Sequence, residues 1–328
     1  MEPIIEIALL LGGIAALYFG ADWLVRGSVA LALRLGIPPV IVGLTIVAFG
    51  TSSPELLVSF NAGRMGNADI AIGNVIGSNI ANIALILGAA ALIRPIVMNI
   101  RAVRLDIIFM LAVSGLLCFM VLDGDLKRTD GVLLLAGITF YVVYKVRQAI
   151  HRRREGKVDE LDLEVEKEPV EGARELSRGR SIVYIVAGLL VLVVGSELFI
   201  RGAVTLARML GVSNVVIGLT VVAVGTSLPE LATSVLAAAK GEGDVSLGNV
   251  VGSNIFNILF ILGATSLFFP IGTGDVNMID LLVMMGTSVL IIPISLIGGR
   301  VTRPEAGLLL AIYISYVYYL YTHHAAGL

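Results

Sequence analysis

The amino-acid sequence predicts an all-α membrane protein with ten transmembrane helices, arranged as two inverted-topology repeats of five. Three observations lead to this prediction. The 328 residues are 57% hydrophobic and only 15% charged, with a mean hydropathy of +0.95, so a soluble domain would have too little polar surface to cover itself. Apolar stretches of about 20 residues, enough for a helix to cross a bilayer, recur along the chain. One long segment also occurs twice.

Each of ten apolar segments is predicted to form a membrane-spanning helix. The first and sixth are long enough to cross the bilayer with a strong tilt. The N-terminus lacks the basic region of a signal peptide, so the first segment is expected to remain in the mature protein. The segments lie near residues 4–34, 40–64, 69–93, 104–122, 130–150, 181–210, 215–240, 244–269, 276–298 and 304–322.

A charged stretch separates the two groups of five segments. We therefore predict a first repeat over residues 1–150, a cytoplasmic linker over 151–180 and a second repeat over 181–328. The low hydrophobicity of the linker is typical of a solvated connection. An alternative interpretation is a calcium sensor, but the linker lacks the ligand spacing and turn glycine of an EF-hand loop. That sensor would use Asp159, Glu160, Asp162, Glu164 and Glu166.

The orientation of the predicted helices follows from their number and from the basic residues. Five spans per half make the second half enter the membrane in the opposite direction. With the N-terminus outside and the linker cytoplasmic, 18 Lys and Arg residues lie on the inner side and five on the outer side. This agrees with the positive-inside rule. We therefore expect a multi-pass protein of the cell membrane in that orientation.

The repeated segment is the main indication of function. Residues 41–96 align with residues 216–271 at a constant offset of 175, and 31 of 56 pairs are identical. The identities fall on Gly, Thr, Ser, Pro, Asn and Glu, so shared apolarity does not explain them. Each copy places a carboxylate, Glu55 or Glu230, inside a strongly apolar segment. Because an ionisable group is costly in lipid, we take both glutamates as candidate functional residues.

A proline precedes each glutamate and is expected to break its helix, because proline has no N–H to donate and clashes with the preceding turn. Non-helical backbone at membrane depth is tolerated where it is buried in protein or lines a polar cavity. The first copy offers the carbonyls of Ala48 and Thr51, the Ser52 hydroxyl and the Glu55 carboxylate. Oxygen ligands of this kind suit Ca²⁺, Na⁺ or Mg²⁺. The second copy offers the same set from Ala223, Thr226, Ser227 and Glu230.

The following span of each copy adds small and polar residues. Gly73 and Gly77, like Gly248 and Gly252, form a face that permits close helix packing. Four asparagines are interpreted as hydrogen-bonding residues between helices: Asn74, Asn79, Asn249 and Asn254. Two further side chains in each copy are four residues apart, share one helical face and are expected to line the cavity. They are Ser78 and Asn82 in the first copy, and Ser253 and Asn257 in the second.

Other features narrow the class of protein. Asp22 with Arg26, and Glu197 with Arg201, are spaced for ion pairs on one helix face, and we interpret these pairs as structural. The single cysteine, Cys118, excludes an internal disulfide. The chain has no phosphate-binding Gly-x-x-x-x-Gly-Lys-Ser/Thr loop, which argues against a nucleotide-driven pump. We expect no enzymatic activity, no cofactor, no nucleic-acid partner and no obligate protein partner.

Gly-Thr-Ser-x-Pro-Glu followed by Gly-Asn-x-x-Gly-Ser-Asn, present in both halves, resembles the α repeats of the calcium/cation antiporter superfamily. The resemblance is to the prokaryotic sodium/calcium exchanger type. It implies that Glu55, Glu230 and the carbonyls of Thr51 and Thr226 bind Ca²⁺. It also implies flanking Na⁺ sites formed by the hydroxyls of Ser52, Ser78, Ser227 and Ser253 and the carbonyls of Ala48 and Ala223. Asn82 and Asn257 occupy positions where the family has an amide or a carboxylate.

The resemblance further implies antiport of sodium and calcium by alternating access, with sodium entry driving calcium extrusion. Proton-coupled relatives usually carry glutamate where this chain has Gly77 and Gly252, which argues against proton coupling. Asn257 in place of aspartate argues against a potassium requirement. Two alternatives remain open: a proton/calcium antiporter, and a cation channel with a pair of glutamates as its filter. The transported ions and the lipid bilayer are the expected partners.

Overall fold

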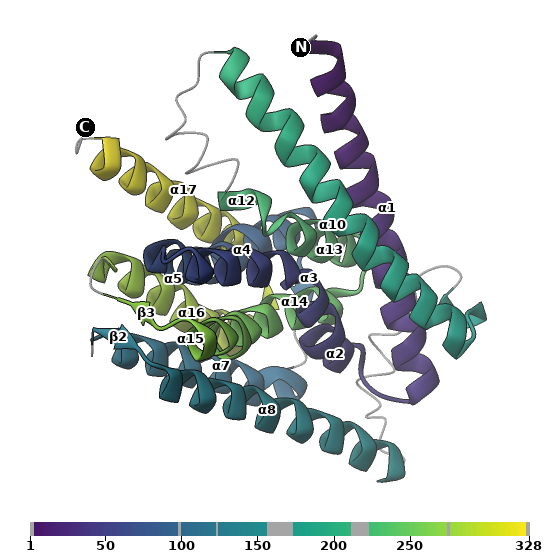
Figure 1. Ribbon diagram of the computed structural model, residues 1–328. Coiled ribbons are helices and arrows are strands. Elements are labelled where there is room, and N and C mark those ends of the chain that lie inside the picture. The colour runs from purple at the N-terminus through teal and green to yellow at the C-terminus, as the bar shows by residue number, and fades with distance from the viewer. Residues whose placement is uncertain are drawn as a thin grey trace.

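The computed structural model describes residues 3–97, 100–122, 124–155, 173–210, 223–273 and 276–325, and most of them are helical (Figure 1). The α-helices are α1 (Pro3–Leu35), α2 (Pro39–Val42), α3 (Ala48–Thr51), α4 (Ser53–Arg64), α5 (Ala68–Ile80), α6 (Gly88–Ile93), α7 (Ile100–Leu122), α8 (Arg128–Glu155), α10 (Arg178–Met209), α12 (Ala223–Gly225), α13 (Leu228–Ala239), α14 (Gly243–Phe256), α15 (Gly263–Phe268), α16 (Met278–Gly298) and α17 (Arg303–Ala325).

Several helices are suited to a membrane. Among the described residues, six are long and apolar enough to cross one, and a seventh span results if the bent pair Pro39–Thr51 and Ser53–Arg64 is counted together. Shorter apolar helices cover Leu228–Ala239 and Met278–Ile294. Apart from the breaks and a few end residues, the described part of every predicted span is helical, but only the six helices and the bent pair meet the criteria of length and composition.

The two longest helices, α1 and α10, pack against each other along their length beside the remaining helices (Figure 1). Glycines bring the two backbones together: a Cβ atom added at Gly13 would lie 2.6 Å from the Phe199 nitrogen, and one at Gly27 would lie 2.8 Å from the Ser181 carbonyl oxygen. Because the early part of α1 meets the late part of α10, the two helices run antiparallel. They occupy equivalent positions of the sequence repeat.

The helix breaks predicted at the prolines are present. Helices α3 and α4 are bent by 44° at Ser52, and Pro54 lies in the first turn of α4. In the second half α12 ends at Gly225, and α13 begins at Leu228 with Pro229 in its first turn. Proline fits a first helical turn because the N–H groups there have no partner inside the helix. Each break therefore lies three or four residues before a glutamate.

Within the described ranges, three π-helical segments interrupt the helices near the candidate site. These are η1 (Gly43–Val47), η2 (Ala81–Leu87) and η5 (Asn257–Leu262). A π segment inserts an extra residue into a helical turn and rotates the side chains that follow. The sequence pattern did not predict these segments. Segments η2 and η5 occupy equivalent positions of the repeat. They contain the equivalent candidate residues Asn82 and Asn257.

Helix α14 lies at the centre of the molecule. Every residue from Val245 to Phe256 is buried, and α14 contacts η1, α2 and α3 of the first half as well as α13 and α7. Its glycines permit this packing: a Cβ atom added at Gly248 would lie 2.7 Å from the Val40 carbonyl oxygen, and one at Gly252 would lie 2.7 Å from the Leu44 carbonyl oxygen. The predicted close-packing face is thus confirmed in the second copy.

Short strands and a 3₁₀ turn complete the described structure. Strand β1 (Ile96–Val97) pairs antiparallel with β4 (Arg300–Val301), and β2 (Asp125–Leu126) pairs antiparallel with β3 (Ile271–Gly272). Both pairs therefore join one half to the other at equivalent positions of the repeat. The 3₁₀ turn η3 (Ala173–Glu175) packs against α1. The acidic residues of the suggested calcium sensor lie outside the described residues.

Candidate functional site

The two glutamates of the repeat lie in the first turns of α4 and α13 and are buried. Glu55 and Glu230 are each 1% exposed. The two carboxylates are close enough to repel each other electrostatically. Two buried acidic groups without a basic partner are costly, so their position requires compensation from other polar groups or from a bound cation.

Serines from the opposite half donate to both carboxylates. The Ser52 hydroxyl donates to Oε1 of Glu230 at 2.9 Å, and the Ser227 hydroxyl donates to Oε1 of Glu55 at 2.9 Å. These bonds cross between the halves. Each serine lies three residues before the glutamate of its own half but donates to the glutamate of the other half. Within the described residues, Oε2 of both glutamates is buried without a hydrogen-bond partner. Each carboxylate thus keeps one buried oxygen that can bind a cation.

Asparagine amides form a second set of crossed bonds. The Asn82 amide donates to Oδ1 of Asn254 at 2.9 Å, and the Asn257 amide donates to Oδ1 of Asn79 at 3.0 Å. In the described part of the chain, the Oδ1 atoms of Asn82 and Asn257 are buried and accept no hydrogen bond. Asn79 and Asn254 therefore join the helices, as predicted, while Asn82 and Asn257 retain an acceptor oxygen.

The remaining predicted hydroxyl groups lie around the same carboxylates. The Ser227 hydroxyl lies 3.4 Å from that of Ser78. Ser253 and Thr51 lie close to the Glu230 carboxylate, and Thr226 lies close to the Glu55 carboxylate. The structure therefore gathers the predicted side-chain groups of both halves into one buried cluster that is rich in oxygen atoms.

The predicted role of the backbone carbonyls needs one correction. The Ala48 carbonyl is not freed by the helix break, because it accepts the Ser52 N–H at 3.1 Å. The carbonyl that loses its helical donor to Pro54 is that of Gly50, four residues earlier, and it accepts another backbone N–H at the end of α3. In the second half, the Ser227 N–H donates to the Val224 carbonyl at 3.1 Å instead. Ala223 is the first residue of α12.

Sequence analysis did not single out the serines that support the asparagines. Asn249 donates to the Ser234 hydroxyl at 2.9 Å, and its Oδ1 accepts a hydrogen bond of 3.1 Å from the Thr51 hydroxyl. Asn74 donates to the Ser59 hydroxyl at 2.9 Å. Ser59 and Ser234 are identical in both copies and lie four residues after a glutamate. The signal available in the sequence was that each serine lies on the same helical face as the glutamate four residues before it.

The predicted ion pairs of the long helices are confirmed. Arg26 lies 2.9 Å from the Asp22 carboxylate, and Arg201 lies 2.6 Å from that of Glu197. Lys240, at the end of α13, forms a further ion pair with Asp22. This last contact connects α1 to a helix of the candidate site.

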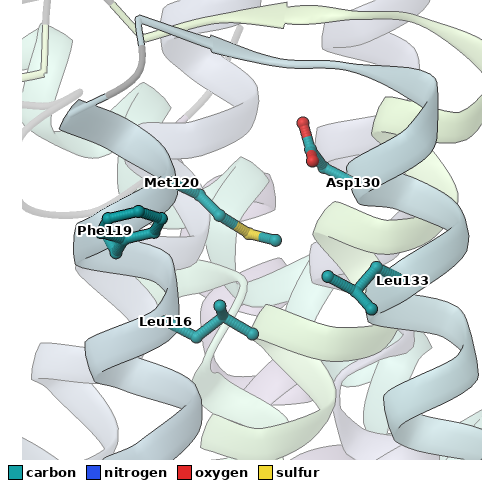
Figure 2. A pocket seen from close by; sticks show the side chains of 5 residues that line it. All are labelled: Leu116, Phe119, Met120, Asp130 and Leu133. Carbon is teal, nitrogen blue, oxygen red and sulfur yellow. The ribbon is translucent and has the colours of Figure 1, made fainter.

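A separate cavity of about 350 Å³ lies between α7 and α8. Figure 2 shows the apolar side chains that line it and the Asp130 carboxylate beside them. The Asp130 carboxylate accepts the Lys127 N–H at 2.7 Å and so caps the start of α8. The residues lining this cavity contribute nothing to the cluster around the glutamates.

A search for a compact cluster of metal-binding side chains would miss the candidate site. In the described ranges, no group of three or more His, Cys, Asp and Glu side chains could hold a metal ion. The site instead combines two carboxylates with hydroxyl and amide oxygens from both halves. Such a mixed oxygen set is typical of sites for Ca²⁺ and other hard cations.

The chain matches the family model described as sodium/calcium exchanger protein twice, over residues 5–147 and 180–322. It is 32% identical to the sodium/calcium exchanger MaX1 of Methanosarcina acetivorans, over 97% of this chain and 99% of the relative. It is 35% identical to the inner membrane protein YrbG of Escherichia coli, over 80% of each chain.

Among solved structures, the chain is similar to the sodium-calcium exchanger NCX_Mj soaked with zero Na⁺ and Ca²⁺. The TM-score is 0.81 at 33% sequence identity, covering 97% of this chain and 100% of the other. The two matches of the family model are separated by the offset of the internal repeat. The chain is therefore a multi-pass membrane protein that belongs to the sodium/calcium exchanger family.

Proposed function

We propose that this protein is a secondary active antiporter that exchanges Na⁺ for Ca²⁺ and, under a normal sodium gradient, extrudes Ca²⁺. The crossed hydrogen bonds between the halves carry the proposal: each serine donates to the glutamate of the opposite half, and each glutamate retains one buried, unpaired oxygen within the described residues. Two negative charges shared between the halves are balanced by one Ca²⁺ or by more than one Na⁺.

The proposed Ca²⁺ ligands are the two carboxylates together with the carbonyls of Thr51 and Thr226. The proposed Na⁺ ligands are the hydroxyls and carbonyls that flank them, and the amides of Asn82 and Asn257 complete the polar wall. The flanking set comprises Ser52, Ser78, Ser227, Ser253, Ala48 and Ala223. Ala48 would act through the second lone pair of a carbonyl that also accepts the Ser52 N–H.

Competition for the carboxylates provides the coupling between the ions. If Na⁺ and Ca²⁺ both need Glu55 and Glu230, binding of one opposes binding of the other. With no cation bound, two charged carboxylates resist enclosure in a site of low dielectric constant. The protein then changes conformation only when the carboxylates are neutralised, and this requirement makes exchange obligatory.

We further propose ten membrane spans in two inverted repeats, residues 1–150 and 181–328, joined by a cytoplasmic linker, with the N-terminus outside. The antiparallel packing of the equivalent helices α1 and α10 supports this arrangement. So does the pairing of strands between the halves at equivalent positions. In alternating access, α1 and α10 move against the helices that hold the glutamates.

The proposal is tested with purified protein in sealed vesicles. Vesicles loaded with Na⁺ and diluted into Na⁺-free buffer containing Ca²⁺ are expected to accumulate Ca²⁺, whereas a pH gradient alone is expected to drive none. Glu230→Gln is expected to abolish the uptake, because it removes one of the two charges that bind Ca²⁺. Glu197→Gln is the matched control, since Glu197 is an exposed glutamate paired with Arg201 on α10.

Two results would contradict the proposal. Uptake under a pH gradient but not under a sodium gradient would identify a proton/calcium antiporter. A calcium current that needs no counter-ion would identify a channel. Accessibility of cysteines introduced at each end of the chain to a membrane-impermeant thiol reagent, in a Cys118→Ser background, tests the proposed orientation.

A further inference from the structure

We infer that Ser196 of α10 is a positioning residue for the ion site, acting through the carbonyl of Gly225. This inference rests on the proposed function. It begins from Pro229, which has no N–H to donate to the carbonyl four residues earlier. That carbonyl belongs to Gly225, the last residue of α12. A buried carbonyl without a donor is costly, so a replacement donor stabilises the break.

Ser196 supplies that donor. Its hydroxyl lies 2.7 Å from the Gly225 carbonyl oxygen, and its side chain is buried. The bond replaces the helical hydrogen bond that proline removes and joins α10 directly to the break in the site helix. Close packing accompanies it: a Cβ atom added at Gly225 would lie 2.6 Å from the Ile200 side chain.

The fixed carbonyl is adjacent to the cation ligands. Thr226 follows Gly225 directly, and Ser227 comes next and donates to Oε1 of Glu55 at 2.9 Å. Displacement of the Gly225 peptide therefore moves the donor that orients Glu55. Among the described residues, the Ser196 hydroxyl bonds to Gly225 and not to a proposed ligand, so its effect on ion binding passes through the backbone of α12.

The same bond connects the site to the long helices. Helices α1 and α10 meet backbone to backbone, for example at Gly195, where an added Cβ atom would lie 2.9 Å from the Leu17 nitrogen. Because these glycines leave no space for side chains between the helices, we expect α1 and α10 to move as one unit. A shift of that unit along the site helices would stretch or break the Ser196 bond.

The repeat shows that this bond belongs to one half. The position equivalent to Ser196 is Ala21 of α1, which has no hydroxyl to offer the Gly50 carbonyl. The first half therefore has no corresponding contact from that position. We assign to Ser196 the role of holding the second half-site in its binding geometry until α10 moves.

The test measures Ca²⁺ uptake as a function of Ca²⁺ concentration in the sodium-loaded vesicles. Ser196→Ala is expected to raise the half-saturating Ca²⁺ concentration roughly fivefold, the typical effect of losing one hydrogen bond, without lowering the maximal rate. Ser196→Thr keeps a hydroxyl and is expected to restore the half-saturating concentration to within about twofold of the unmodified protein. A purely structural defect would instead reduce the maximal rate in both variants.

Ser28→Ala is the matched control, because Ser28 is a buried serine of α1 whose hydroxyl has no hydrogen-bond partner within the described residues. It is expected to leave both kinetic parameters unchanged. An unchanged half-saturating concentration in Ser196→Ala would overturn the inference.

Amide hydrogen exchange provides a readout that does not depend on transport. Ser196→Ala is expected to accelerate exchange of the Ser227 and Leu231 amides, which follow the fixed carbonyl, and Ser28→Ala is expected to leave them unchanged. Unchanged protection in Ser196→Ala would also overturn the inference. If the unmodified protein exchanges no Ca²⁺, the proposed function fails, and hydrogen exchange still tests whether Ser196 fixes the break.

Discussion

The two halves of the molecule carry the same candidate ligands in different surroundings. In the second half, α14 is buried along its length from Val245 to Phe256. In the first half, the equivalent helix α5 has an exposed Gly73 and only partly buried Asn74 and Gly77. The crossed Ser–Glu bonds nevertheless have the same length, 2.9 Å, in both directions. Among the described residues, which leave out 211–222, the hydrogen bonds of the cluster are symmetric although the packing around them is not.

This difference shows which parts of a duplicated site are constrained. The serines and glutamates of the cluster contact each other across the halves, so a change at one of them affects the candidate ligands of both halves. Two supporting contacts have diverged between the halves: Ser196 corresponds to Ala21, and Lys240, which pairs with Asp22 of the first half, corresponds to Met65. Under the proposed alternating access, such differences in support are expected to let the two halves move unequally.

The largest effect on stability is expected at the buried ion pair of the first half. Lys145 and Asp106 are 2.8 Å apart with side chains that are 2% exposed, and Asp106 also accepts a bond from Tyr141 at 3.0 Å. Lys145→Leu leaves a buried charge without its partner and is expected to cost about 3–5 kcal/mol. Thermal unfolding in detergent, followed by circular dichroism, measures the loss.

The second half supplies the control for this prediction, because it has leucine at both equivalent positions, Leu281 and Leu320. Changing Asp106 and Lys145 to leucine together, with Tyr141→Phe to avoid an unpaired hydroxyl, is expected to recover most of the stability. If the combined variant is no more stable than Lys145→Leu, the ion pair is not what distinguishes the two halves.

The next largest effect is expected at the crossed serines. Ser52→Ala and Ser227→Ala each remove one hydrogen bond to a carboxylate, worth about 1.5–3 kcal/mol. Each is therefore expected to weaken Na⁺ binding roughly tenfold or more, measured by competition with Ca²⁺ in titration calorimetry. The symmetry of the cluster predicts effects that agree within about threefold. A much larger effect of one serine would show that the two half-sites are not equivalent.

A smaller and unequal pair of effects is expected at the asparagines of α5 and α14. Asn249 is fully buried and bonded to both Ser234 and Thr51, so Asn249→Ala is expected to cost about 2–3 kcal/mol of stability. Asn74 is partly buried, and Asn74→Ala is expected to cost about 1 kcal/mol. Thermal unfolding of both variants under one condition measures the difference. Equal losses would contradict the difference in packing.

The smallest effect is expected at Lys240. Lys240→Met gives the second half the residue of the first, Met65, and removes the ion pair with Asp22. Asp22 keeps Arg26 as a partner, and the Lys240 side chain is 20% exposed, so the cost is expected to stay below about 1 kcal/mol. The loss should shrink as salt is added to the unfolding experiment. A loss that is independent of salt would indicate packing instead of charge.

Much of the candidate site could be predicted from the sequence. Proline and glutamate at equivalent positions of the repeat predicted the broken helices and the buried carboxylates, because proline acts on its own helix wherever it occurs. Asn79 and Asn254 were correctly interpreted as contacts between helices. The prediction that the break frees the Ala48 carbonyl was wrong, because the backbone kept one more helical bond before the break.

Other contacts could not be predicted, because they depend on how distant segments meet. Nothing in the spacing of Ser196 indicates that its hydroxyl reaches Gly225, 29 residues away. A glycine follows each of the π segments η2 and η5, Gly88 or Gly263, but a glycine at a helix position does not by itself indicate a π turn. The contact from Lys240 to Asp22 joins residues 218 positions apart.

The sequence by itself determined the family, the helical class, the helix breaks and the residues of the candidate site. These follow from local chemistry: apolar length, proline geometry and the cost of a carboxylate in lipid. Only the tertiary structure decided that each serine serves the glutamate of the other half, and that α14 is enclosed while α5 is partly open. Hydrogen-bond partners and burial arise when the two halves pack together, and a duplicated sequence does not specify how unequal that packing is.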